Sequence, residues 1–279
     1  MIEDLLKEKY GEMSKTQKRI AGHIIKNIVE TSYSSVNALA KSVGTSEASI
    51  IRFCNFLGYN GFPELKKELQ KTTKQHNSMQ NRVRKSYAAY GEKEAVIAKV
   101  FNDDIMRIEK TLETMNMEDF FSACDEIILA NRVFIIASRS AAALGSFFQY
   151  YLNMAIGNVQ LIDDVGCKAD VLSSIKSDET VIGLTFSRYA RSTSELFHYA
   201  AEHNANMIGI TDTTLSPIVP DSQYCFFTET SMPTYLDSFA APLALINAFL
   251  TEIGRMRNVE LEHRVTGLDR FYDEFGTFK

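Results

Sequence analysis

The sequence predicts an all-α N-terminal domain joined to an α/β domain with a parallel five-stranded sheet flanked by helices. Two observations predict this fold class. Residues 14–69 place apolar side chains at helical spacing. From Arg132 onward, short β-branched or aromatic runs alternate with helical segments, which is the pattern of parallel strands joined through helices. A chain of 279 residues is long enough for one small and one medium domain.

Charge supports this division. Residues 1–85 contain 15 Lys and Arg against 8 Asp and Glu, although the whole chain has a formal net charge of −5. A basic N-terminal part on an acidic body is typical of a DNA-binding domain joined to a separate module. We predict an N-terminal domain over 1–77, a polar linker over 78–92 and a C-terminal domain over 93–279.

Composition excludes several classes of protein. The longest apolar run, Ala240–Leu250, is too short to cross a bilayer, and the charged N-terminus has no signal-peptide apolar region. We therefore expect a cytoplasmic protein without a membrane partner. No H-E-x-x-H, P-loop or G-x-G-x-x-G motif occurs, so no metal or cofactor is predicted. The four cysteines lack zinc-site or disulfide spacing and predict reduced, buried thiols: Cys54, Cys124, Cys167 and Cys225.

The first domain contains a helix–turn–helix pattern. One helix is predicted over Ser14–Glu30 with Ser14 as its N-cap, and a second is predicted over "SVNALAKSV". Gly44 then supplies a turn residue that tolerates positive φ, before a third helix in "SEASIIRFCNFLG". Apolar residues that fix the crossing of the last two helices stand at the expected offsets: Leu39, Ala40, Val43, Ile50 and Phe53.

The third helix has two different edges. Ile50, Phe53, Cys54 and Leu57 recur at i, i+3, i+4 and i+7 and predict the buried edge. The opposite edge carries the candidate DNA contacts Ser46, Ser49, Arg52 and Asn55. Small hydroxyls let the backbone approach phosphate, and the forked guanidinium of Arg52 suits a guanine edge or a phosphate. The alternative for Arg52 is a solvated surface arginine, and Glu47 is either an acceptor for a cytosine edge or an outward-facing cap.

The segment "GYNGFPELKKEL" completes this domain. Gly58 is predicted as a helix C-cap, Asn60-Gly61 as a tight turn and Pro63 as the start of a new helix. Lys66 and Lys67 on that helix are candidate phosphate contacts.

The second domain is predicted to contain helices at 93–114 and 117–130 before an alternating region. The predicted strands are "RVFIIAS", "GNVQLI", "ETVIGLTF", "NMIGIT" and "SQYCFFT". The predicted helices between them are 141–155, 165–176 and 192–203. In such sheets ligands bind at the carboxyl ends of the strands.

Two of these strand ends are rich in small polar residues. "ASRSAA" follows the first strand and "TFSRYARSTSE" follows the third. Serine hydroxyls beside free helix N–H groups, together with Arg139 and Arg188, suit a phosphate or sulfate. The alternative is that these Ser and Thr residues are ordinary helix caps.

The stretch "SEASIIRFCNFLGYNGFPELKKEL" resembles the end of the DNA-binding domain in the RpiR/MurR family of bacterial transcriptional regulators. "VFIIASRSAAAL" and "LTFSRYARST" resemble the loops of the SIS (sugar isomerase) domain, a flavodoxin-like fold that binds phosphorylated sugars in this family. Three positions depart from the family pattern: Ala137, Ala141 and Ala190. The resemblance implies a ligand site at Ser138, Arg139, Ser140, Ser187, Arg188, Ser192 and Thr193. Tyr189 is expected either to cover the sugar ring or to be structural.

We therefore predict a non-enzymatic transcriptional regulator that binds a double-stranded DNA operator, senses a phosphorylated sugar effector and forms a homodimer or homotetramer. The helix at 238–252 and the tail at 259–275 are candidates for association, with core packing as the equal alternative. Two other functions stay open. A sugar-phosphate isomerase-like enzyme would need a proton shuttle among Glu195, His198, Glu202 and His203. A DNA-binding regulator with a degenerate ligand site would ignore sugars.

Overall fold

The computed structural model describes residues 2–76, 82–83, 95–164, 166 and 168–277. The chain divides into two compact units, which are described separately below. The first unit comprises Met1–Gly91 with Pro233–Tyr235, and the second comprises Glu92–Met232 with Leu236–Lys279. Of the predicted linker at 78–92, only residues 82 and 83 are among the described residues.

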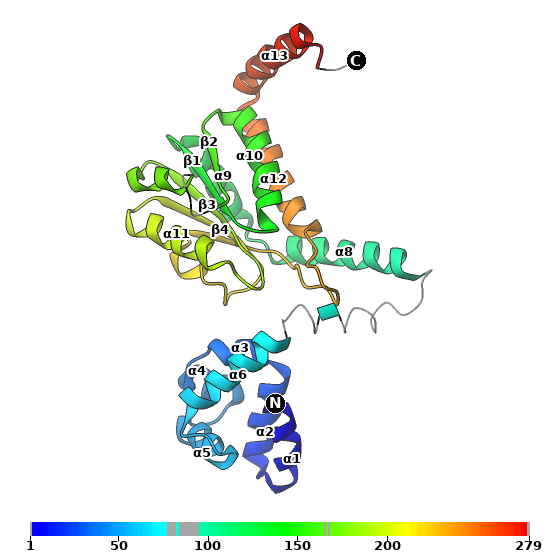
Figure 1. Ribbon diagram of the computed structural model, residues 1–279, viewed down its shortest axis with the longest axis vertical. Helices are drawn as coiled ribbons and strands as arrows, with labels where there is room; N and C mark the ends of the chain where they lie inside the picture. The colour runs from blue at the N-terminus through cyan, green and yellow to red at the C-terminus, as the bar shows by residue number, and fades with distance from the viewer. Residues whose placement is uncertain (1, 77–81, 84–94, 165, 167, 278–279) are drawn as a thin grey trace. The chain divides into compact units, whose positions relative to one another are not determined.

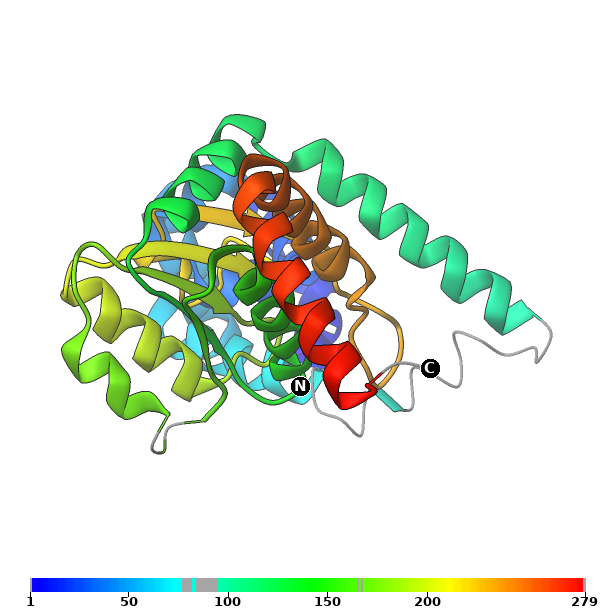
Figure 2. The same ribbon diagram turned by 90° about the horizontal axis from the view of Figure 1, so that it is seen from above.

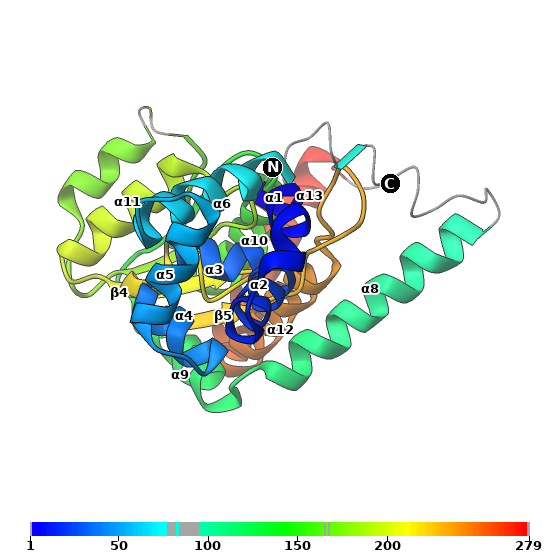
Figure 3. The same ribbon diagram turned by 90° about the horizontal axis from the view of Figure 1, so that it is seen from below.

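The N-terminal unit is helical (Figure 3). Its elements are α1 (Ile2–Lys9), the 3-10 helix η1 (Tyr10–Glu12), α2 (Lys15–Lys26), α3 (Ile28–Tyr33), α4 (Val36–Val43), α5 (Glu47–Leu57) and α6 (Phe62–His76). One core joins these helices, and its fully buried side chains include Ile20 of α2, Leu39 of α4, Phe53 of α5 and Leu65 of α6. The all-α prediction for this part of the chain is confirmed.

The predicted helix over Ser14–Glu30 is two helices. Its start is as expected, because Ser14 caps α2 through a capping box with Gln17. Its end is not, because Asn27 leaves the helical conformation and separates α2 from α3. The Asn27 amide donates to the carbonyl of His23 at 3.2 Å. Short polar side chains that bond the backbone in this way compete with helix continuation.

The C-terminal unit contains an all-parallel sheet with the strand order β2-β1-β3-β4-β5 (Figure 1). The strands are β1 (Val133–Ala137), β2 (Val159–Ile162), β3 (Thr180–Leu184), β4 (Asn206–Thr211) and β5 (Tyr224–Phe227). β1 and β3 are buried along their whole length, as expected of parallel strands covered on both faces.

Helices cover both faces of this sheet. On one face, α9 (Met117–Leu129), α10 (Ala141–Ile156) and α12 (Ala240–Met256) pack with Ile135, Ile182 and Ile210. On the other, α11 (Arg191–Glu202) and the 3-10 helix η2 (Ala169–Ser174) pack with Phe134 and Val181. The remaining elements are α8 (Ala95–Thr114), the 3-10 helix η3 (Val219–Asp221) and α13 (Asn258–Phe275). The predicted α/β domain with a five-stranded parallel sheet is confirmed.

Gly145 allows α10 to lie close to the sheet. A Cβ at this position would stand 2.7 Å from Leu161 Cδ1 and 3.1 Å from Ala137 Cβ. This close approach places the N-terminal half of α10, which begins directly after the first polar loop, against β1 and β2.

The predicted helix over 165–176 is wrong. The chain instead forms η2, a 3-10 helix over Ala169–Ser174. Upstream of it, the Asp164 carboxylate accepts a hydrogen bond from the Gly166 N–H at 2.9 Å. This local turn competes with helix formation at the predicted start. Residues 165 and 167, and with them the expected thiol of Cys167, lie outside the described residues.

The two predicted association segments differ in burial. α12 packs in the core, where Leu245, Ile246 and Phe249 are buried, whereas α13 has no buried residue. α8 packs against α12 and extends beyond it (Figure 2).

None of the helices in the described part of the chain is long and apolar enough to pass through a membrane.

Candidate functional site

The candidate recognition helix, α5, packs into the N-terminal unit through the edge that was predicted to be buried. Ile50, Phe53, Cys54 and Leu57 are all buried in the N-terminal core. The turn before α5 is held by Gly44, which has φ +69°, and by Arg19, whose guanidinium donates to the Gly44 carbonyl at 2.7 Å. Gly58 ends α5 in the left-handed conformation. The orientation of the opposite edge is therefore fixed by packing and by both helix ends.

A row of hydrogen bonds runs along that opposite edge. The Ser46 and Ser49 hydroxyls lie 2.9 Å apart, and Arg52 Nη2 donates to Ser49 Oγ at 3.0 Å. Ser46 also caps α5, because its side chain accepts from the Ser49 N–H. Arg52 and Asn55 are exposed. The structure thus brings the predicted residues Ser46, Ser49 and Arg52 into one connected, accessible row.

Glu47 lies beside this row and contacts the preceding helix. Asn37 Nδ2 of α4 donates to Glu47 Oε1 at 2.7 Å. The carboxylate therefore joins the two helices of the helix–turn–helix motif across the turn. Asn37 was not among the predicted site residues, and its one signal in the sequence was a polar side chain early in α4.

The two lysines of α6 have different surroundings. Lys66 Nζ donates to the carbonyls of Tyr33 and Ser34 at 3.0 and 2.9 Å, at the C-terminal end of α3. A cation there satisfies carbonyls that have no partner within the helix. Lys67 is exposed. Of the pair, Lys67 is the one whose charge faces solvent.

In the C-terminal unit, the two predicted ligand loops lie at one edge of the sheet. β1 and β3 are adjacent and parallel, so the loops that follow them leave the sheet side by side. The hydroxyl of Ser138 in the first loop lies 3.2 Å from that of Ser192, and it accepts from Thr193 Oγ1 at 2.9 Å. The structure therefore brings together three of the predicted ligand residues from two loops.

Both predicted ligand arginines have unusual backbone conformations. Arg139 and Arg188 have φ of +59° and +66°, a left-handed conformation that is uncommon for residues other than glycine. Arg139, Arg188 and Ser140 are all exposed. Strained backbone of this kind clusters at functional sites. Here it occurs at equivalent positions of the two loops, one residue after Ser138 and one after Ser187.

A small cleft lies between the loops. It is lined by Ser138, Arg139, Ser140, Ala141, Thr185, Phe186, Ser187, Arg188, Ala190, Asp237 and Phe239. Asp237 and Phe239 come from the segment between β5 and α12, which no sequence pattern connects with the loops. No local motif marks these two residues, because only the tertiary fold brings their segment to the cleft.

Tyr189 braces the second loop. Its hydroxyl donates to Asp212 Oδ1 at 2.8 Å, and the Ser187 N–H donates to Asp212 Oδ2 at 2.9 Å. Burial raises the pKa of the Asp212 carboxyl above its usual range, and the hydrogen bonds from Tyr189 and Ser187 oppose this shift. Asp212 follows β4 directly. It was not among the predicted site residues, although an acidic residue at the carboxyl end of a buried strand was a visible signal.

The residues considered for an isomerase lie away from the cleft lining. His198 Nδ1 lies 3.0 Å from Asp221 Oδ2, and Nε2 lies 3.6 Å from Glu202 Oε1, with the imidazole and the Glu202 side chain largely exposed. Neither His198 nor Glu202 is among the cleft-lining residues. Throughout the ranges that the structure describes, no group of three or more His, Cys, Asp or Glu side chains is placed to hold a metal ion.

Two family models match the chain. The model for the helix–turn–helix domain of the rpiR family matches residues 1–76, and the SIS domain model matches residues 126–252. The matched ranges contain α5 and both polar loops, respectively.

Relatives and solved structures agree with these matches. HexR, an HTH-type transcriptional regulator of Pseudomonas aeruginosa, is 23% identical over 266 residues, covering 92% of this chain and 90% of HexR. The sugar isomerase domain of an RpiR transcription factor from Sphaerobacter thermophilus is 22% identical, with a TM-score of 0.61, covering 63% of this chain and 99% of that structure. The Vibrio vulnificus NanR protein complexed with ManNAc-6P is 15% identical, with a TM-score of 0.67, covering 99% of both chains.

The helix–turn–helix match precedes the SIS match along the chain, and the observed fold agrees with both. The chain therefore belongs to the rpiR family of helix–turn–helix transcriptional regulators that carry a SIS domain.

Proposed function

We propose that this regulator binds operator DNA through α5 and that a phosphorylated sugar in the cleft between the two loops changes its affinity for the operator. The DNA contacts would be Ser46, Ser49, Arg52 and Asn55, with Lys67 on phosphate. The proposal that a sugar phosphate binds here rests mainly on one observation: two loops that carry serine and arginine residues lie side by side at one edge of the sheet.

The geometry of α5 supports the DNA half. Its buried edge fixes the helix, and the hydrogen-bonded row from Ser46 to Arg52 presents small hydroxyls and a guanidinium to solvent. Arg52 can donate two parallel hydrogen bonds to a guanine edge or to a phosphate. The excess of basic residues in 1–85 adds the non-specific attraction to DNA.

The chemistry of the cleft supports a phosphate ester. Ser138, Ser140 and Ser187 of the cleft lining carry hydroxyl groups, α10 and α11 begin at the two loops, and Arg139 and Arg188 supply positive charge. The NanR structure, which has the same fold, holds ManNAc-6P. We extend to this chain only the chemical class, a phosphorylated sugar.

We further propose a homodimer or homotetramer, because operator recognition by one small helix–turn–helix domain is strengthened by a second half-site. Exposed apolar residues on the helices outside the sheet layers support association. They include Ile97, Phe101, Ile105 and Leu112 of α8 and Phe271 and Phe275 of α13.

Two measurements on the full-length protein test the proposal. An operator is first selected from random-sequence DNA, and calorimetry then measures binding of hexose, pentose and amino-sugar phosphates. We expect one phosphate ester to bind and to shift operator affinity in a gel-shift titration. Operator binding without heat from any sugar phosphate would instead indicate a regulator with a degenerate ligand site. Turnover of a bound sugar phosphate would favour the isomerase function.

A further inference from the structure

We propose that Arg107 couples the cleft to α8, the helix that follows the N-terminal unit in the chain. The inference rests on the proposed function, since it takes the cleft as the effector site. Arg107 acts as a positioning residue: it touches neither DNA nor effector but holds a segment that lines the cleft.

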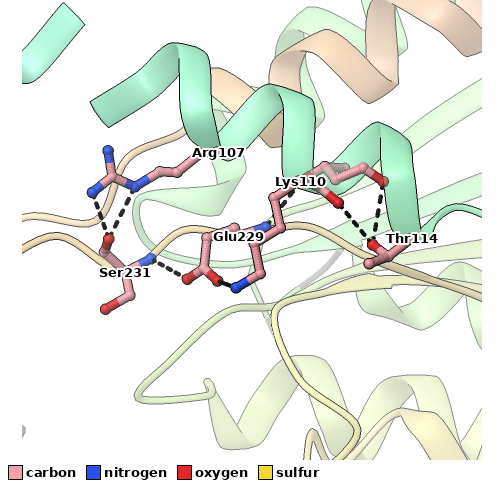
Figure 4. Close-up of polar contacts among 6 residues, drawn as sticks. Arg107, Lys110, Thr114, Glu229 and Ser231 are labelled. Carbon is pink, nitrogen blue, oxygen red and sulfur yellow. Dashed lines mark hydrogen bonds and ion pairs between the residues drawn. The ribbon is translucent and has the colours of Figure 1, made fainter. Parts of the chain in front are cut away.

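Arg107 is a buried cation with a specific set of partners (Figure 4). Its Nε and Nη2 both donate to the carbonyl of Ser231, at 2.9 and 2.7 Å, and Nη1 lies 3.1 Å from Asp104 Oδ1. Its side chain is only 9% exposed. A buried guanidinium is tolerated when its donors are paired, and the planar group makes such a contact rigid.

Further bonds fasten α8 to the same segment. Lys110 Nζ pairs with Glu229 Oε2 at 2.5 Å, and the Glu229 N–H donates to Thr111 Oγ1 at 3.2 Å. At the other end of the segment, Ser238 Oγ donates to Asp104 Oδ1 at 2.6 Å. α8 therefore holds the segment near its start, at Glu229 and Ser231, and near its end, at Ser238.

This segment also forms one wall of the cleft. It joins β5 to α12, and Asp237 and Phe239 at its end line the cleft together with Ser138 and Ser187. The Phe239 ring lies 5.4 Å from that of Phe186, which directly precedes Ser187 in the second loop. The residues that touch the cleft and the residues that α8 holds thus belong to one irregular segment, without a sheet or helix ladder to fix it.

The charge at the cleft gives the coupling a cause. Asp237 brings a carboxylate to the same cleft as the cations Arg139 and Arg188, so an anion bound there changes the charge that this carboxylate faces. A bound phosphate ester therefore favours a position of this segment different from the one in the empty cleft. Arg107 and its neighbours pass that difference to α8, because the segment and the helix move as one hydrogen-bonded body. Such a differential preference is what linkage between two sites requires.

The test compares Arg107→Gln with Arg255→Gln in the full-length protein. Arg255 is a matched control because it pairs with Glu252 at the same i,i+3 spacing as Arg107 with Asp104, but on the exposed side of α12. The probe is the sugar phosphate that shifts operator affinity most in the panel above. We expect Arg107→Gln to bind it within about threefold of the unmodified protein, while its effect on operator affinity falls from about tenfold to below about twofold. Arg255→Gln should retain the full effect, and a full effect in Arg107→Gln would overturn the proposal.

Two further measurements keep the proposal testable. If Arg107→Gln fails to fold, Glu229→Gln removes a more exposed part of the contact between α8 and the segment. We expect Glu229→Gln to reduce the effect of the sugar phosphate on operator affinity by about half or more. An unreduced effect would count against the proposal. A third measurement needs no effector. Phe239→Leu should raise the hydrogen-exchange rate of the backbone amides in residues 104–111 at least about threefold, and this rise should be absent when Phe239→Leu is combined with Arg107→Gln. If no sugar phosphate binds, the proposed function fails, and this exchange experiment alone decides the coupling.

Discussion

The hydroxyl of Tyr189 donates a 2.8 Å hydrogen bond to Asp212, a carboxylate at the end of the neighbouring strand β4. The other oxygen of that carboxylate accepts from the Ser187 N–H at 2.9 Å. One acidic residue therefore holds both the side chain and the backbone of the second polar loop. This bracing explains how Arg188 can be kept at a positive φ between the two contacts.

We predict that Tyr189→Phe weakens binding of the effector by about 5- to 10-fold, because loss of one hydrogen bond of about 1 kcal/mol loosens the loop. The measurement is calorimetry with the sugar phosphate identified in the panel. Tyr151→Phe, on an exposed tyrosine of α10, is the control and should bind as the unmodified protein does. Equal affinity in Tyr189→Phe would show that this bond does not organise the site.

Asp212 should make stability depend on pH. Burial raises its pKa above the usual range, so the folded state favours the protonated carboxyl. The stability that this group contributes is fully present below its unfolded pKa of about 4 and is lost as the pH rises through the raised folded pKa. Asp212→Asn lacks this dependence, so its stability relative to the unmodified protein should improve as the pH rises from about 4 to 7.

The pH prediction is checked by urea titration of Asp212→Asn and the unmodified protein at several pH values, with hydrogen exchange in peptides of β3 and β4 as the readout of unfolding. Asp221→Asn, on an acidic residue of η3 that contacts His198 away from the cleft, serves as the comparison. A relative stability of Asp212→Asn that declines with rising pH would contradict the prediction.

Arg52→Ala should strongly weaken operator binding. Loss of a bidentate contact to a base costs about 1–3 kcal/mol, which is a decrease of about 5- to 150-fold in affinity. The fold should survive, because Arg52 is exposed and its described hydrogen bond is to Ser49 on the same edge. Gel-shift titration gives the affinity and circular dichroism checks the fold. Lys7→Ala on α1 is the control, and unchanged binding in Arg52→Ala would remove this residue from the interface.

Much of this architecture could be predicted from local patterns. The apolar period of α5 and the alternation of strands and helices each depend on neighbouring residues, so the fold class and the buried edge of α5 were correct. Local polar bonding was harder to foresee: Asn27 divides the first predicted helix and Asp164 replaces the start of another with a turn.

The parts of the site that were missed depend on contacts between distant residues. Asp212 lies 23 positions from Tyr189, and Arg107 lies 124 positions from Ser231. Residues such as Asp237 and Phe239 have no periodic or motif signal, because the tertiary fold alone brings them to the cleft. The serine- and arginine-bearing loops could be predicted because each sits directly after a recognisable strand.

Two glycines of the N-terminal unit should respond to alanine in opposite directions. Gly44 has φ +69° and open space where the methyl group of an alanine would lie, so Gly44→Ala meets no clash and its cost comes from the left-handed backbone. We expect it to destabilise the unit by about 1 kcal/mol. Gly22 lies within α2, also with open space around it, and Gly22→Ala should stabilise the unit by about 0.5–1 kcal/mol. Urea titration with hydrogen exchange in peptides of α2–α5 measures both. Because Gly44 also sets the turn before α5, Gly44→Ala should weaken operator binding, whereas Gly22→Ala should leave it unchanged. If both variants raised or both lowered the free energy of unfolding, the backbone explanation would be refuted.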